Sequence, residues 1–240
     1  MPNVAEPAIV SEELDGEFYR LIPSRFPTID VYERVAPPGR WPMLQQIETL
    51  TNSRAKERQA MIGADQVESP PPHLQNWNHA PFVYVDPDGS AILSGAFGVL
   101  EVGQDKETAI AMAVARREAF LSATRLDPHP LEMRMLAHRI SGRFAALGDL
   151  SALSQSERWA LGASLYEHWD GAVFTCLETG RGATIAVFNV ESLGRATQAE
   201  HYRFVWDGSR IRTVYNFNDI GDGDGKGLDP QSLCVGKRAA

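Results

Sequence analysis

Apolar positions recur with helical spacing in three parts of the chain, and this pattern predicts three helices. The clearest covers residues 106–123, begins after Asp105 as its N-cap, and carries the apolar stripe Ile110, Ala113, Val114, Phe120 and Leu121. Met112 lies off that stripe and is expected to face solvent or a different surface. The capping box Ser154-Gln155-Ser156-Glu157 begins a second helix, and a third is expected over residues 42–61.

Alternating or continuous apolar runs between these helices predict strands over residues 82–85, 91–102, 133–140, 172–177 and 183–190. Residues 202–206 and 211–217 flank Asp207-Gly208-Ser209, which is typical of a hairpin. Helices and strands together predict an α+β fold. We expect a flexible N-terminus over residues 1–17, one domain over 18–217, a proline loop at 68–72, and a flexible Gly/Asp-rich tail over 218–240.

Composition narrows the class of protein further. The chain has 240 residues and a 43% apolar fraction, which is enough for one core without covalent staples. Its net charge is −8 with dispersed basic residues, so we expect no direct nucleic-acid binding. The sequence has neither an export leader nor an apolar run of about 18 residues, so we expect a cytoplasmic protein without a membrane span.

The usual metal and nucleotide motifs are absent from the sequence. The six histidines form no HExxH pattern, and neither GxGxxG nor GxxxxGK[ST] occurs. Residues 222–225 lack most ligands of a calcium loop, so no metal cofactor is predicted. The spacing of Cys176 and Cys234 matches neither a disulfide framework nor a pair of metal ligands. Cys176 lies in an apolar strand, where a buried structural thiol is expected rather than a nucleophile.

A series of short blocks carries a family resemblance through its shared order. The series begins with Tyr19-Arg20-Leu21-Ile22-Pro23-Ser24-Arg25-Phe26-Pro27 and continues through residues 50–54, 88–90, 95–99, 107–111, 170–174 and 186–188. It ends with His201-Tyr202-Arg203-Phe204-Val205-Trp206-Asp207-Gly208. In this order the blocks resemble the longer members of the RES family of NAD-consuming bacterial toxins, over residues 18–217.

The resemblance implies a fold similar to the diphtheria-toxin-like ADP-ribosyltransferase core, with a mixed sheet flanked by helices around an NAD cleft. Members of that family degrade NAD or transfer ADP-ribose, so the resemblance names NAD as the substrate. They belong to toxin–antitoxin modules, so it also implies an antitoxin-like protein partner.

The family's catalytic signature is an Arg, a Tyr, a helical Glu and a distant Ser, and this chain differs at all four positions. The equivalent residues are Ala91, Glu101, Met112 and Cys176, and the resemblance implies that they converge on one cleft. A His often found on the family helix corresponds to Arg116, and the Arg after the family Ser corresponds to Glu178. Arg20 and Arg25 match early family arginines, which either reach a ligand phosphate or serve the structure.

These replacements remove the groups that would clamp phosphate, stack on nicotinamide and stabilise an oxocarbenium-like transition state. We expect weak or no NAD binding, with Glu101 repelling the pyrophosphate. Two hypotheses follow. The chain is either a divergent NAD-consuming enzyme with a rebuilt cleft, or a non-catalytic binding or regulatory protein that engages an antitoxin-like partner.

Overall fold

The computed structural model describes residues 9–24, 40, 43, 76–217 and 227–233. Within them, helices α3 (Asn76–Val83), α4 (Lys106–Ser122) and α5 (Gln155–Leu165) accompany a seven-stranded mixed sheet in a single α+β domain. Its strands are β1 (Val10–Pro23), β2 (Leu100–Gly103), β3 (His129–Gly148), β4 (Gly171–Thr175), β5 (Ala183–Val187), β6 (Leu193–Trp206) and β7 (Ile211–Asn216). Short 3₁₀ turns occupy Val190–Ser192 and Pro230–Ser232.

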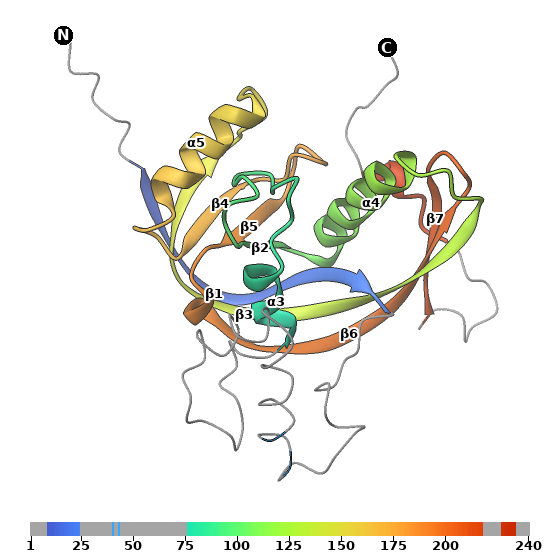
Figure 1. Cartoon of the computed structure of the whole chain (residues 1–240), viewed down its shortest axis with the longest axis horizontal. Coiled ribbons are helices and arrows are strands. Elements are labelled where there is room, and N and C mark those ends of the chain that lie inside the picture. The colour runs from blue at the N-terminus through green and yellow to red at the C-terminus, as the bar shows by residue number, and fades with distance from the viewer. Residues whose placement is uncertain (1–8, 25–39, 41–42, 44–75, 218–226, 234–240) are drawn as a thin grey trace.

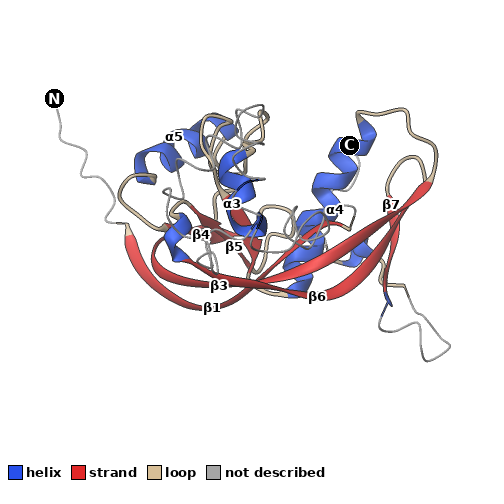
Figure 2. Cartoon of the chain, turned by 60° about the horizontal axis from the view of Figure 1, so that its bottom comes forward, coloured by secondary structure: helices blue, strands red, loops and turns tan. Residues whose placement is uncertain are grey.

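The strands follow the order β1-β2-β5-β4-β3-β6-β7, and β1 also pairs with β3. This extra pairing closes β1, β2, β5, β4 and β3 into a ring, while β6 and β7 extend the sheet beyond it. Among the strands of the described residues, β3 and β4 are the one pair that runs in parallel. Figures 1 and 2 show β1, β3 and β6 as long bowed strands, with α4 and α5 over the concave side at opposite ends.

Three clusters of buried side chains hold these layers together. One lies between α4 and the β3–β6–β7 end of the sheet and includes Val114, Met135 and Phe204. A second lies between α5 and strands β4 and β5, and a third contains side chains from strands of the ring, including Phe144. No described helix has both the length and the apolarity needed to cross a membrane.

Capping interactions explain where the two longer helices begin. The Asp105 side chain accepts a hydrogen bond from the Thr108 N–H at 2.7 Å and begins α4, as predicted. Ser154 and Glu157 form the predicted reciprocal capping box of α5. Asp207 accepts hydrogen bonds from the N–H groups of residues 209 and 210 in the predicted turn between β6 and β7.

Two of the strand predictions were wrong. Residues 82–85, predicted to be a strand, instead complete α3 and the bend after it, because Phe82 packs against the ring and Asn78 bonds to Gly194. The predicted strand over residues 91–102 is strand only from Leu100, because the Ser90 hydroxyl accepts hydrogen bonds from two backbone N–H groups and bends the chain. The other predicted strands overlap β3, β4, β5, β6 and β7, although those over 172–177, 183–190 and 211–217 continue one to three residues past the observed strand ends.

Both expected domain ends need correction. β1 begins at Val10 rather than near residue 18, because its backbone pairs with β3 up to Ala146 even where its side chains are exposed. Within the expected flexible tail, Leu228 forms a two-bond bridge with Val214, and Leu233 packs against the core under α4. Apart from residue 43, the helix expected over 42–61 and the loop at 68–72 lie outside the described residues.

Candidate functional site

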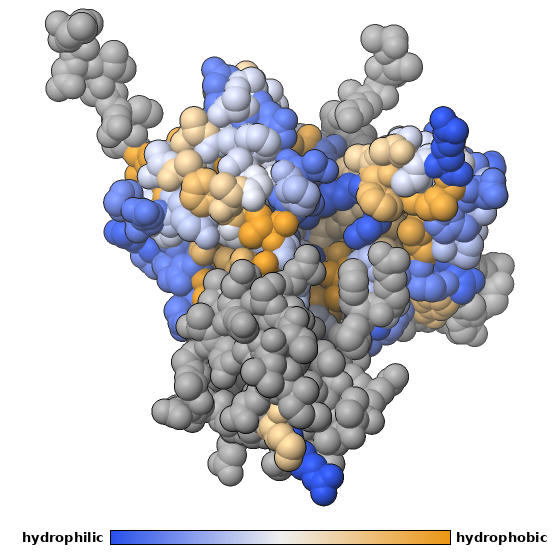
Figure 3. Space-filling view, in the orientation of Figure 1, coloured by the Kyte–Doolittle hydropathy of each residue, from blue (hydrophilic) through white to orange (hydrophobic). Residues whose placement is uncertain are grey.

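A cavity of about 490 Å³ lies among β1, the segment between α3 and β2, α4, α5 and the end of β4. Its charged lining residues are Arg20, Asp86, Glu101, Arg116, Arg158 and Glu178. Figure 3 shows a hollow between the surface formed around α5 and the surface formed around α4. The volume falls within the range of small-molecule sites in proteins.

The cavity unites several positions that the resemblance assigned to an NAD cleft. Ala91 and Glu101 line it, as do Arg116 and Glu178, which stand at the family His and second Arg positions. Ala91 contributes backbone rather than side-chain chemistry. Its N–H donates to Glu101 Oε1 at 3.0 Å, and its carbonyl accepts from Arg158 Nε at 2.9 Å.

Glu101 is buried, and both of its carboxylate oxygens are engaged. Its side chain is 3% exposed, Oε1 accepts from Ala91, and Oε2 forms an ion pair with Arg116 of α4. The expectation that Glu101 repels an anion therefore needs correction, because Arg116 offsets its charge locally. Through these two contacts Glu101 connects β2 to α4 and to the loop at residue 91.

Met112 and Cys176 lie outside the described lining of the cavity. Met112 is buried, and its Sδ accepts a hydrogen bond from Thr184 Oγ1 of β5 at 3.7 Å. It faces the sheet because Thr108, Met112 and Arg116 follow one another at helical spacing along β2 and β5. The expected stripe residue Phe120 is instead 59% exposed.

Cys176 is fully buried, as predicted for a structural thiol. Its Sγ–H donates to Glu178 Oε2 at 3.2 Å, which connects it to the cavity wall. Burial raises the pKa of this thiol, and the Glu178 charge adds to the effect. A thiol whose ionisation is suppressed in this way is a poor nucleophile.

Arg20 is the predicted ligand-binding residue that the structure places in the cavity; Arg25 lies outside the described residues. Arg20 as a whole residue is half-buried, and no hydrogen bond or ion pair joins its guanidinium to another described residue. Burial lowers its pKa, and repulsion from Arg116 lowers it further, while Glu101 partly offsets both effects.

A buried polar pair beside Arg20 was not predicted from the sequence. His138 on β3 is fully buried, and its Nδ1 lies 2.9 Å from Asn78 Oδ1 of α3, while Asn78 Nδ2 donates to the Gly194 carbonyl. Its Nε2 has no hydrogen-bond partner among the described atoms. Burial, with a contribution from the Arg20 charge, lowers the pKa of His138 to about 3, which keeps the ring neutral.

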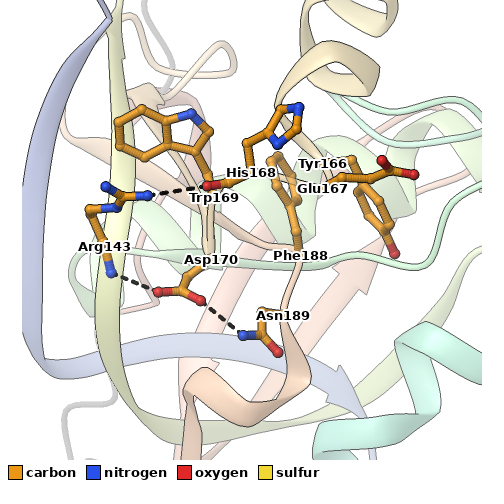
Figure 4. Close-up of a pocket in the computed structure, with 8 residues that line it drawn as sticks. All are labelled: Arg143, Tyr166, Glu167, His168, Trp169, Asp170, Phe188 and Asn189. Atoms are coloured by element: carbon orange, nitrogen blue, oxygen red, sulfur yellow. Dashed lines mark hydrogen bonds between the residues drawn. The ribbon is translucent and has the colours of Figure 1, made fainter.

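A second pocket of about 370 Å³ lies where the turn before β4 meets β3 and residues 188–189 (Figure 4). Its Asp170 accepts from the Arg143 backbone N–H and from Asn189 Nδ2, both at 2.8 Å, so both carboxylate oxygens are occupied. Arg143 donates to the His168 carbonyl and lies over the Trp169 ring at 4.9 Å. These contacts stabilise the β3–β4 connection and leave the polar groups of this pocket occupied. We therefore assign the candidate site to the first cavity.

No group of three or more His, Cys, Asp or Glu side chains within the described part of the chain has the arrangement of a metal site. The lining of the first cavity instead combines guanidinium groups, carboxylates and apolar walls. Such a lining can bind and orient a small molecule that carries charge.

No family model matches the chain. A protein of Sinorhizobium fredii (strain NBRC 101917 / NGR234), described as uncharacterized protein y4oC, is 43% identical over 210 residues. The matched region covers 87% of this chain and 91% of that protein.

Proposed function

We propose that this chain, which belongs to the same protein family as y4oC of Sinorhizobium fredii, is a RES-like protein that binds a small molecule in its cavity without consuming NAD. The proposal takes its family role from the ordered sequence blocks. The residues that occupy the signature positions support the lack of catalysis. A fold alone does not establish an activity, so the proposal relies on the site residues, which favour the non-catalytic hypothesis.

One observation carries the proposal. Where the family has a phosphate-clamping Arg and a stacking Tyr, this chain has the Ala91 backbone joined to a buried Glu101, which is itself ion-paired to Arg116. These contacts are already satisfied, so the wall offers neither a free guanidinium nor an aromatic ring at those two positions. The family Glu and Ser positions hold Met112 and Cys176, and neither supplies a carboxylate or a reactive hydroxyl.

The expected kinetic consequence is large. Removing a single group that stabilises developing charge in a transition state typically slows a reaction by about 10²- to 10³-fold. Several such groups are replaced here, and their contributions need not add. We therefore expect residual NAD cleavage to be too slow to deplete the NAD of a cell.

The test measures nicotinamide release from NAD by the purified full chain, with an active NAD glycohydrolase as positive control. Induction of the chain in bacteria, with cellular NAD and growth followed in parallel, completes it. We expect no release, no fall in NAD and no growth arrest. Rapid NAD loss would reject the proposal and favour the enzyme hypothesis, with chemistry carried by other residues.

The antitoxin-like partner implied by the resemblance remains part of the proposal, because loss of catalysis does not require loss of a binding surface. Co-expression with the product of a neighbouring gene, followed by size-exclusion chromatography, tests it. A stable complex would support a regulatory role that derives from a toxin–antitoxin module. Separate elution of the two proteins would reject that partner.

A further inference from the structure

We infer that the cavity binds a small monocarboxylate with an apolar body, and that the Arg20 guanidinium receives the carboxylate. This inference rests on the proposed function, because it names the ligand class of the same site. Three properties of the cavity lining support it: a cation without a hydrogen bond or ion pair to another described residue, neighbouring arginines that already have partners, and apolar walls.

Arg20 has the properties of a ligand-binding cation. It lines the cavity, is half-buried, and lacks a hydrogen bond or ion pair within the described residues. A guanidinium removed from water without a partner is costly, and a bound anion would offset that cost. Among the described residues, Arg116 and Arg117 lower the pKa of Arg20 and Glu101 raises it, so cations outnumber carboxylates around this guanidinium, although the charges of the whole lining balance. An anion placed there gains attraction from this excess.

The other lining arginines already have partners. Arg116 is ion-paired with Glu101, while Arg158 donates to the carbonyls of Ala91 at 2.9 Å and Leu153 at 2.7 Å. This leaves one planar guanidinium, whose two parallel N–H groups match the two oxygens of one carboxylate. A second negative charge on the ligand, as in a phosphate monoester, would find no further free cation among the described lining residues and would meet the lining carboxylates Asp86 and Glu178.

The remaining walls define the body of the ligand. Val85, Phe97, Val99 and Leu177 supply apolar surface, and the Tyr84 ring, 52% exposed, lies at the rim. A carboxylate with an aromatic or short aliphatic group would bury that group against these walls at about 25 cal/mol for each Å² removed from water. The cavity volume of about 490 Å³ accommodates a ligand of that size.

Calorimetric titration of the full chain tests the inference with four probes: phenylacetate, hexanoate, phenylacetamide and phenyl phosphate. We expect both carboxylates to bind. The neutral amide should bind about ten- to hundredfold more weakly, because it cannot form charge-assisted hydrogen bonds with Arg20. Phenyl phosphate should bind more weakly than phenylacetate. This comparison needs no variant and therefore does not depend on whether a substituted chain folds.

Variants then locate the site. Arg20→Met should weaken phenylacetate binding by about ten- to hundredfold, and Arg20→Lys by a smaller factor, because lysine keeps the charge but loses the paired donors. Arg139→Gln is the matched control, since it removes an arginine whose ion pair with Asp15 is on the exposed surface. It should leave the affinity unchanged.

Three outcomes would overturn the inference: no carboxylate binding by the native chain, equal affinity for phenylacetate and phenylacetamide, or tighter binding of phenyl phosphate. Failure here is distinguishable from failure of the proposed function. NAD cleavage in the nicotinamide assay rejects the proposed function, whereas absent carboxylate binding without NAD cleavage rejects only the ligand class.

Discussion

Replacing His138 with glutamine should change how the stability of this protein responds to acid. In an unfolded chain a histidine has a pKa of about 6.5, whereas burial, aided by the Arg20 charge, holds the pKa of His138 at about 3 in the fold. Between these two values the unfolded chain binds a proton that the folded chain does not. This contribution to stability is therefore complete above about pH 6.5 and is lost as pH falls toward 3.

The size of the effect follows from this difference. Where the unfolded chain binds about one more proton than the folded chain, the free energy of unfolding falls by about 1.4 kcal/mol per pH unit. Applied to pKa values of about 6.5 and about 3, linkage gives a loss of about 2.5 kcal/mol between about pH 7 and pH 4.5. Carboxylates also titrate over part of this range, so the quantity to measure is a difference between two proteins.

Urea unfolding at several pH values supplies that difference, with native His138 and His138→Gln compared under the same conditions. Glutamine keeps an amide that can pair with Asn78 and does not titrate. The native protein should lose about 2.5 kcal/mol more than the variant over this interval. Parallel profiles for the two proteins would refute the claim that His138 is held neutral by burial.

Three other substitutions test particular contacts by the free energy of unfolding. Gly162→Ala should lower the free energy of unfolding by about 1 to 3 kcal/mol, because the new Cβ would lie 2.0 Å from the Ile92 carbonyl oxygen. Alanine normally stabilises a helix relative to glycine, so a stabilised variant would contradict the packing of α5 described above. Arg116→Gln should lower the free energy of unfolding by about 1 to 3 kcal/mol, because it leaves the buried Glu101 carboxylate without its cation. Adding Glu101→Gln should recover part of that loss. If the losses of the two single variants simply add in the double variant, the two side chains are not coupled. Ser154→Ala should cost about 1 kcal/mol by removing the cap of α5, and an unchanged midpoint would show that the cap contributes nothing.

Local features of the fold were predictable because they depend on neighbouring residues. The Asp105 cap, the Ser154 capping box and the turn at Asp207 each follow from side-chain chemistry within three residues of the chain. The alternating runs of β3 and β5 also indicated strands. Segment 82–85 failed because its apolar run looks the same in a buried strand and in a short helix, and packing of Phe82 decides between them.

The candidate site depends on contacts between distant elements, and the sequence carries little signal for them. Glu101 and Arg116 meet only because α4 packs along β2, which no local pattern specifies. Met112 was predicted to lie off the core stripe and to face solvent or a different surface, and the second alternative holds, because α4 buries two sides over this part of its length. His138 interrupts an apolar run, and a polar residue at an expected core position was the available clue.

The pairing of β1 with β3 has a consequence for biosynthesis. β1 is the first described strand to leave the ribosome, yet its partners in β3 run from Met133, opposite Pro23, to Ala146, opposite Val10. At translation rates of about 5 to 20 residues per second, β1 waits roughly 5 to 25 s before β3 is made. Through that interval its hydrogen-bonding edges are open to other chains, and the acidic side chains at Glu12, Glu13 and Asp15 would discourage such pairing by like-charge repulsion.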